Sequence, residues 1–129
     1  MPLIAALISS VAIAAAPQPQ METALASWYD TPGIGACDLG PDVQSGYRFA
    51  SLFLRCGARV RFCRRGACVV ATMADRGPYV SGRLFDLNVP LRDVLHCGGL
   101  CYVRWTTRWR RPPPAVGGLV AVGAVGELF

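Results

Sequence analysis

The stretch DRGPY, residues 75–79, and the stretch RLFDLN, residues 83–88, decide the fold that we predict for this chain. Pro78 has no amide donor, and Gly77 is the residue most free to take a positive φ. A strand that reaches residue 75 therefore cannot continue through them. We predict that the chain loops out here, with one carboxylate on either side of the turn.

The second stretch predicts a short strand over residues 83–87. Side chains alternate between the two faces of a strand, so Phe85 and Leu87 lie on one face and Asp86 on the other. The two apolar residues would anchor the strand in a core. Asp86 is then predicted to face a cleft.

Short apolar runs and turn signals continue on both sides of this segment. Asn88 as N-cap and Pro90 in the first turn predict one two-turn helix. Residues 31–46 hold four glycines and two prolines and predict a long surface loop. Residues 47–54 fit either a strand or one or two helical turns. Strands are predicted over residues 24–30, 58–62, 68–74 and 102–107, which together favour a small β-barrel over an α/β sheet.

Six cysteines indicate a disulfide framework. An even number in a small exported domain favours disulfides over metal binding, and we predict no metal and no cofactor. Cys63 and Cys68 flank a hairpin tip and are the firmest pair, because cysteines on facing strands are close enough to bridge. Six cysteines allow 15 connectivities. The simplest completion joins Cys37 to Cys56 and Cys97 to Cys101.

The chain ends differ in composition from its middle. Residues 1–16 are apolar and finish in small residues, which is typical of a signal peptide, although the missing basic start leaves an uncleaved anchor or a mis-assigned start open. Residues 17–23 predict a flexible lead-in, residues 24–111 one barrel domain, and residues 112–129 a disordered tail too broken for a membrane span. We expect a monomer that is secreted or held in the cell envelope, with no membrane span after signal cleavage.

The basic residues, 13 against eight acidic ones, are all arginine, and the net charge is +5. Outside a cell, such a surface favours anionic polymers such as cell-wall glycans and teichoic acids. Residues 104–111 interleave tryptophan with arginine, a pattern that predicts a last strand with solvated arginines. A stacking platform for nucleic acid is the alternative, and nucleic acid is not our expected partner.

Four segments in this order resemble the RlpA-like double-psi β-barrel domain: ASWY at 26–29, CGARVR at 56–61, and the two stretches that begin at residues 75 and 83. The resemblance covers residues 24–107, and the Asp-Arg-Gly-Pro and Arg-x-x-Asp-Leu pair makes it specific. Relatives include the barrel domains of expansins, barwin-like proteins, family 45 endoglucanases and lytic transglycosylases. It implies a six-stranded double-psi β-barrel with one short helix that cleaves peptidoglycan glycan strands.

The resemblance also implies roles for particular residues. Asp86 would be the general acid, which requires a raised pKa. Asp75 would stabilise developing positive charge or, alternatively, only hold its turn. Asp30 stands where the family usually has glycine, and it would either act with Asp86 in a two-carboxylate hydrolysis or cap its loop. The predicted substrate-binding residues are Trp28, Tyr29, Tyr47, Arg76, Tyr79 and Arg83.

Departures from the family pattern keep a second function open. Relatives carry Asn-Gly-Glu and Ala-Ala-His segments where this chain has PDVQ at 41–44 and ASL at 50–52. Two polar cleft groups are therefore missing. A non-catalytic, expansin-like module that binds and loosens polysaccharide is the alternative, and its partner would again be peptidoglycan or another polysaccharide. A disulfide-rich effector that binds a protein is a third hypothesis.

Overall fold

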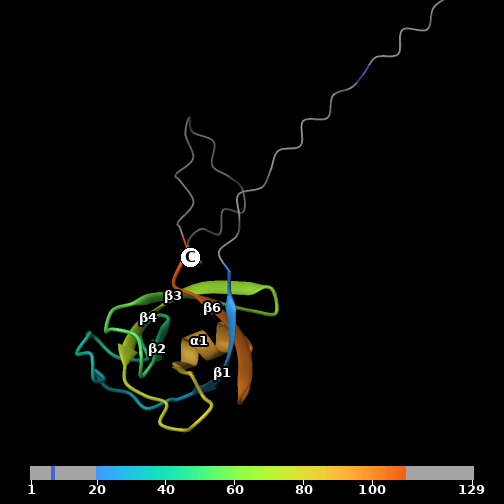
Figure 1. Cartoon of the computed structure of the whole chain (residues 1–129). Helices are drawn as coiled ribbons and strands as arrows, with labels where there is room; N and C mark the ends of the chain where they lie inside the picture. Colours follow the sequence, from blue (N-terminus) through green and yellow to red (C-terminus); the bar gives the residue numbers. More distant parts are fainter. Residues whose placement is uncertain (1–6, 8–19, 110–129) are drawn as a thin grey trace, which may run out of the picture.

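In the computed structural model, which describes residue 7 and residues 20–109, six strands close into a barrel (Figure 1). The ring order is β1-β5-β2-β4-β3-β6. The pairs β1–β5 and β2–β4 are parallel, and the other four are antiparallel. The predicted mainly-β barrel with one short helix is confirmed. The elements are β1 (Glu22–Trp28), β2 (Arg48–Ala50), β3 (Arg59–Arg64), β4 (Ala67–Asp75), β5 (Phe85–Leu87), α1 (Val89–Val94) and β6 (Cys101–Thr106).

The ends of the barrel segment differ slightly from the predicted bounds. Strand β1 begins at Glu22, two residues earlier than the predicted residue 24. Its start lies beside the end of β6, because Glu22 pairs with Trp105 (Figure 1). The predicted signal peptide and C-terminal tail lie outside the described residues, apart from Leu7. No helix in the described part of the chain is long and apolar enough to cross a membrane.

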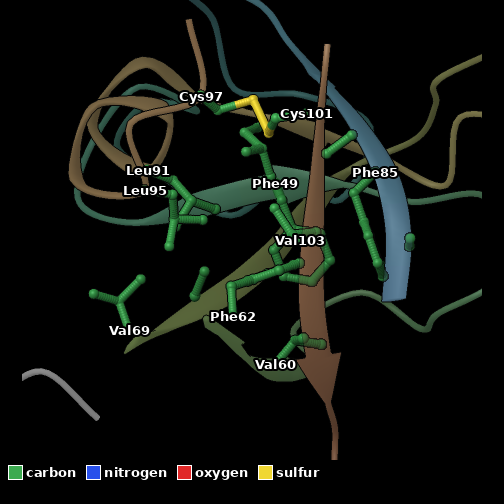
Figure 2. Close-up of a cluster of buried hydrophobic side chains, with 14 of the residues drawn as sticks. Phe49, Val60, Phe62, Val69, Phe85, Leu91, Leu95, Cys97, Cys101 and Val103 are labelled. Atoms are coloured by element: carbon green, nitrogen blue, oxygen red, sulfur yellow. A yellow bond between two sulfur atoms is a disulfide. The ribbon is translucent and has the colours of Figure 1, made fainter. Parts of the chain in front are cut away.

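Three phenylalanines form the centre of the core. Phe49, Phe62 and Phe85 are fully buried and meet edge to face, with ring centroids 5.0 to 5.5 Å apart. Figure 2 shows these side chains gathered inside the barrel, with the Cys97–Cys101 disulfide at one end of the cluster. Edge-to-face aromatic pairs add about 0.5 to 1.5 kcal/mol each beyond the area that they bury. The core therefore fixes the backbone of β5, which carries Asp86 on its other face.

The short helix α1 is fastened at its start by one buried side chain. Asn88 Oδ1 accepts a hydrogen bond from the Leu91 amide at 3.0 Å, which confirms the predicted N-cap. Its Nδ2 donates to the carbonyls of Val43 and Gly46 at 2.9 and 2.8 Å. One residue thus joins the helix to the long loop between β1 and β2.

All three disulfides have the predicted pairing. Cys63–Cys68 closes the β3–β4 hairpin, whose two turn residues Arg65 and Gly66 both have positive φ, as a tight two-residue turn requires. Cys97–Cys101 ties the end of α1 to β6. Cys37–Cys56 links the loop before β2 to the loop after it, which braces the region beside Asp75.

The ambiguous segment at residues 47–54 forms a strand only over Arg48–Ala50. The chain then bends, and the Ser51 hydroxyl accepts hydrogen bonds from the amides of Phe53 and Leu54. Because the Ser51 side chain bonds these two amides, the segment forms neither a helix nor a longer strand.

Candidate active site

Four residues of neighbouring strands form a row across the barrel surface. Ser27 on β1 is in register with Asp86 on β5. Asp86 is in register with Ala50 on β2, and Ala50 is in register with Asp75 on β4. Neighbouring strands lie about 4.8 Å apart, so the backbones of Asp86 and Asp75 are separated by about 10 Å. The fold therefore brings the two carboxylates of the sequence motif to one face, with a small alanine between them.

Asp86 is half-buried, and its position suits an acid that keeps its proton. Burial raises the pKa of Asp86, and the nearby charge of Asp75 raises it further. The Ser27 hydroxyl, which donates to Asp86 Oδ1 at 3.1 Å, and the positive charge of Arg83 act in the opposite direction. Burial is the largest of these effects, so the net pKa of Asp86 lies above its usual value.

Asp75 is held by backbone amides. Its Oδ1 accepts hydrogen bonds from the amides of Ala36 and Arg76, each at 2.8 Å. Gly35 makes the first contact possible, because it has φ of +78° and a Cβ there would lie 2.7 Å from Val43 Cγ1 and 2.8 Å from the Ala74 carbonyl oxygen. Asp75 thus fastens the β1–β2 loop to the end of β4, and its charge still reaches Asp86.

A surface hollow of about 400 Å³ lies over this row, and we call it the Asp86 pocket. Gly77 and Pro78 form part of its wall, so the predicted loop between the two motif stretches borders the site. Its aromatic and polar lining includes Ser27, Trp28, Tyr29, Asp75, Tyr79 and Asp86. Tyr79 stands at the rim with 79% of its surface exposed, so its ring is free to stack on a ligand. Flat aromatic faces beside hydrogen-bonding groups suit a sugar ring.

Tyr29 contributes a phenol that stays protonated. Burial, with added effects of Asp75 and Asp86, raises the pKa of Tyr29 far above its ordinary value. Its hydroxyl oxygen is buried and has no hydrogen-bond partner among the described residues. Tyr29 is therefore a neutral, buried phenol in the pocket wall.

The two predicted arginines differ in orientation. Arg76 lines the pocket, but its guanidinium donates to the carbonyls of Ser51 and Leu54, which makes it a brace for the β2–β3 loop. Arg83 also lines the pocket, and its charge lowers the pKa of Asp86. Arg83 is thus the basic group whose charge acts on the acid directly.

The remaining predicted residues lie at different depths. Trp28 lines the pocket, and the Arg92 guanidinium stacks on its ring at 4.1 Å from the centroid. Tyr47 packs against the hydrophobic core and does not line the pocket. Asp30 is exposed and is also outside the pocket lining, so the structure does not bring it together with Asp86.

Sequence reasoning missed Ser27. It lies 59 residues from Asp86, and nothing local to either residue indicates that they meet. The parallel pairing of β1 with β5 brings them together. A signal did exist in principle, because Ser27 immediately precedes Trp28 in the ASWY segment that resembles the family.

Comparison with solved structures identifies the architecture. The chain is similar to a Streptomyces papain inhibitor, with a TM-score of 0.50 and 21% sequence identity, over 69% of this chain and 94% of the inhibitor. It is also similar to an expansin of Clavibacter michiganensis, with a TM-score of 0.51 and 15% identity, over 73% of this chain and 52% of the expansin. This protein is a double-psi β-barrel. No protein-family model and no curated protein sequence matches it.

The double-psi barrel spans about half the length of the expansin that it resembles. At these identities the likeness concerns the fold, and the chemistry has to be argued from the pocket. Within the described residues, no group of three or more His, Cys, Asp or Glu side chains gathers to hold a metal ion.

Proposed function

We propose that this double-psi barrel is exported and cleaves the glycan strands of peptidoglycan as a lytic transglycosylase, with Asp86 as the acid. One observation carries the proposal: Asp86 is half-buried in a pocket lined by aromatic rings, and burial raises its pKa. A carboxyl group with a raised pKa keeps its proton to a higher pH than an ordinary aspartate, and that proton can be given to a glycosidic oxygen.

The reaction needs a single carboxyl group. Protonation by Asp86 lets the glycosidic C1–O bond break, and positive charge develops on the sugar ring. The sugar's own C6 hydroxyl then attacks C1, and its proton returns to the Asp86 carboxylate, which leaves a 1,6-anhydro product. Asp75, about 10 Å away by strand spacing, contributes negative charge to the same face without touching the proton.

The pocket walls suit a glycan strand. Tyr79 offers an exposed ring face for stacking on a sugar, and Trp28 and Tyr29 form part of the pocket wall beside it. Ser27 holds the Asp86 carboxyl in one orientation. These groups position a sugar linkage, and Asp86 supplies the chemistry.

Digestion of peptidoglycan tests the proposal. The purified protein should release anhydro-muropeptides, detected by mass spectrometry, and Asp86→Asn should lower the rate at least about 100-fold, as expected when a general acid is lost. Asp38→Asn removes an exposed carboxylate outside the pocket and is the matched control, with the rate expected to be unchanged.

Asp30→Asn separates the two mechanisms. The single-acid reaction predicts normal rates and anhydro products for this variant. Hydrolysed, non-anhydro products that disappear in Asp30→Asn would instead support the two-carboxylate hydrolysis. Absence of any product from the wild-type protein would reject the enzyme proposal.

A second candidate is an expansin-like module that binds polysaccharide without cutting it. The observation in its favour is that Asp75 is committed to two backbone amides, so Asp86 has no second free carboxyl group beside it among the described residues. Sedimentation with insoluble cell wall tests this candidate. Pelleting that Asp86→Asn leaves intact, without product release, would support it, and failure to pellet would exclude it.

A further inference from the structure

We infer a second binding site, separate from the Asp86 pocket, at which arginines on the outer surface of β3 and β6 bind an anionic polysaccharide. We call this surface the arginine face and define it by Arg59, Arg61 and Arg104. It lies across the ring from β2 and β5, the strands at the centre of the pocket row.

Strand alternation places the three arginines on the outside of the barrel. Val60 and Phe62 are fully buried, so the intervening Arg59 and Arg61 point outward from β3. On β6, Val103 is buried and Arg104 is exposed. These arginines come from adjacent strands that pair directly.

The strand register brings the charges close together. Arg61 is opposite Thr106, and Arg104 is opposite Cys63, so Arg61 and Arg104 are diagonal neighbours on one face. Such neighbours lie about 7 to 8 Å apart at their backbones, within reach of long side chains. Burial lowers the pKa of Arg61, and the charge of Arg104 lowers it further, as expected for neighbouring cations.

No acidic partner among the described residues offsets these charges at Arg59 or Arg104. The ion pair that the described residues do form, Arg92 with Asp93, is on α1. Arg59 instead lies 5.7 Å from the ring centroid of Trp109, which covers one end of the face without neutralising it. Like charges held side by side destabilise the fold unless an anion binds to them.

The acidic residues are gathered elsewhere. Asp75 and Asp86 line the pocket, and a further set lies in the loop between β1 and β2. Glu22 is the acidic residue beside β6, where it pairs with Trp105. Glu22 lies on the same face of β1 as the buried Ala24. Arg104 pairs with Thr23, which lies on the opposite, outward face of β1. The loop members are Asp30, Asp38 and Asp42.

Charge and compartment together indicate the partner. Three disulfides are typical of proteins outside the reducing cytosol, where polysaccharides that carry carboxylate or phosphate groups are the polyanions at hand. Arginine forms paired hydrogen bonds with both kinds of anion. A polymer bound on β3 and β6 would leave the pocket across the ring open, so the face would anchor the protein beside its glycan.

Three celluloses with one backbone and different charges test the proposal: phosphocellulose, carboxymethyl cellulose and unmodified cellulose. The full chain should bind the two charged forms and release them as salt rises, because the contact is ionic. Arg59→Gln with Arg104→Gln should weaken this binding roughly tenfold at about 0.1 M salt. The stronger of the two charged forms identifies phosphate or carboxylate as the preferred group.

A charge-matched variant separates the face from net charge. Arg55→Gln with Arg65→Gln removes the same two charges from exposed positions that belong neither to the arginine face nor to the lining of the Asp86 pocket, and it should change binding less than about twofold. Soluble carboxymethyl cellulose should also raise the unfolding temperature of the wild-type protein and of this control, but not that of the arginine-face variant. Equal weakening by both variants would overturn the proposal, and so would tighter binding to DNA-cellulose than to either charged cellulose.

Discussion

At the scale of single residues, the raised pKa of Asp86 makes the stability of the folded protein depend on pH. Its pKa is raised, so the native state favours the protonated carboxyl more than the unfolded chain does. The protonated Asp86 carboxyl therefore makes its full contribution to folding stability below the unfolded pKa, near 3.9. This contribution is lost as pH rises through the raised native pKa. Above the native pKa the charged carboxylate weakens the fold.

Asp86→Asn should consequently be more stable than the wild-type protein at pH 7. The gain should be below about 1 kcal/mol, because Asp86 is only half-buried and solvent screens it. The advantage should vanish near pH 3, where both side chains are neutral. Urea unfolding at the two pH values measures this, and an equal difference at both would show that ionisation of Asp86 is not its cause.

The same residue shows what sequence can predict about a site. The orientation of Asp86 toward a pocket was predictable, because strand alternation and a turn are local patterns that are readable within about ten residues. Its partner Ser27 was missed because their contact depends on which strands become neighbours. Likewise, the sequence predicted Arg76 as a substrate-binding residue, but only the folded loop shows that its guanidinium braces two carbonyls.

At the scale of elements, Asn88 joins α1 to the β1–β2 loop. Asn88→Ala should destabilise the protein by about 2 to 4 kcal/mol, because it removes a helix cap and leaves two carbonyls without their donor. Chemical denaturation measures the loss. Asn88→Ser keeps a capping hydroxyl and should recover about 1 kcal/mol. A loss below about 1 kcal/mol in the alanine variant would contradict this role.

The elements themselves were largely predictable from short-range patterns. The hairpin, the helix cap and the strand of Asp86 each follow from turn residues and alternation within one segment. The length of β2 did not, because Ser51 ends it by bonding two later amides. The sequence at residues 47–54 fits several local structures, and the neighbouring strands β4 and β5 select one of them.

At the scale of the whole molecule, the disulfides should contribute unequally to stability. Cys37–Cys56 spans 19 residues and Cys63–Cys68 spans five. Loop-closure entropy assigns about 3 kcal/mol to the longer crosslink and about 2 kcal/mol to the shorter one. Paired Cys→Ser variants, followed by urea unfolding without reductant, should reproduce this order. The reverse order would show that the hairpin crosslink does more than restrict the unfolded chain.

Closure of the ring also determines how another protein can recognise this molecule. Over residues 22–106, each of the six strands has a paired neighbour on both sides along at least part of its length, so no strand is left as the edge of an open sheet. Closure therefore disfavours the addition of a peptide as a seventh strand and the edge-to-edge joining of two copies. We therefore expect partners to contact this region mainly through its side chains and loops.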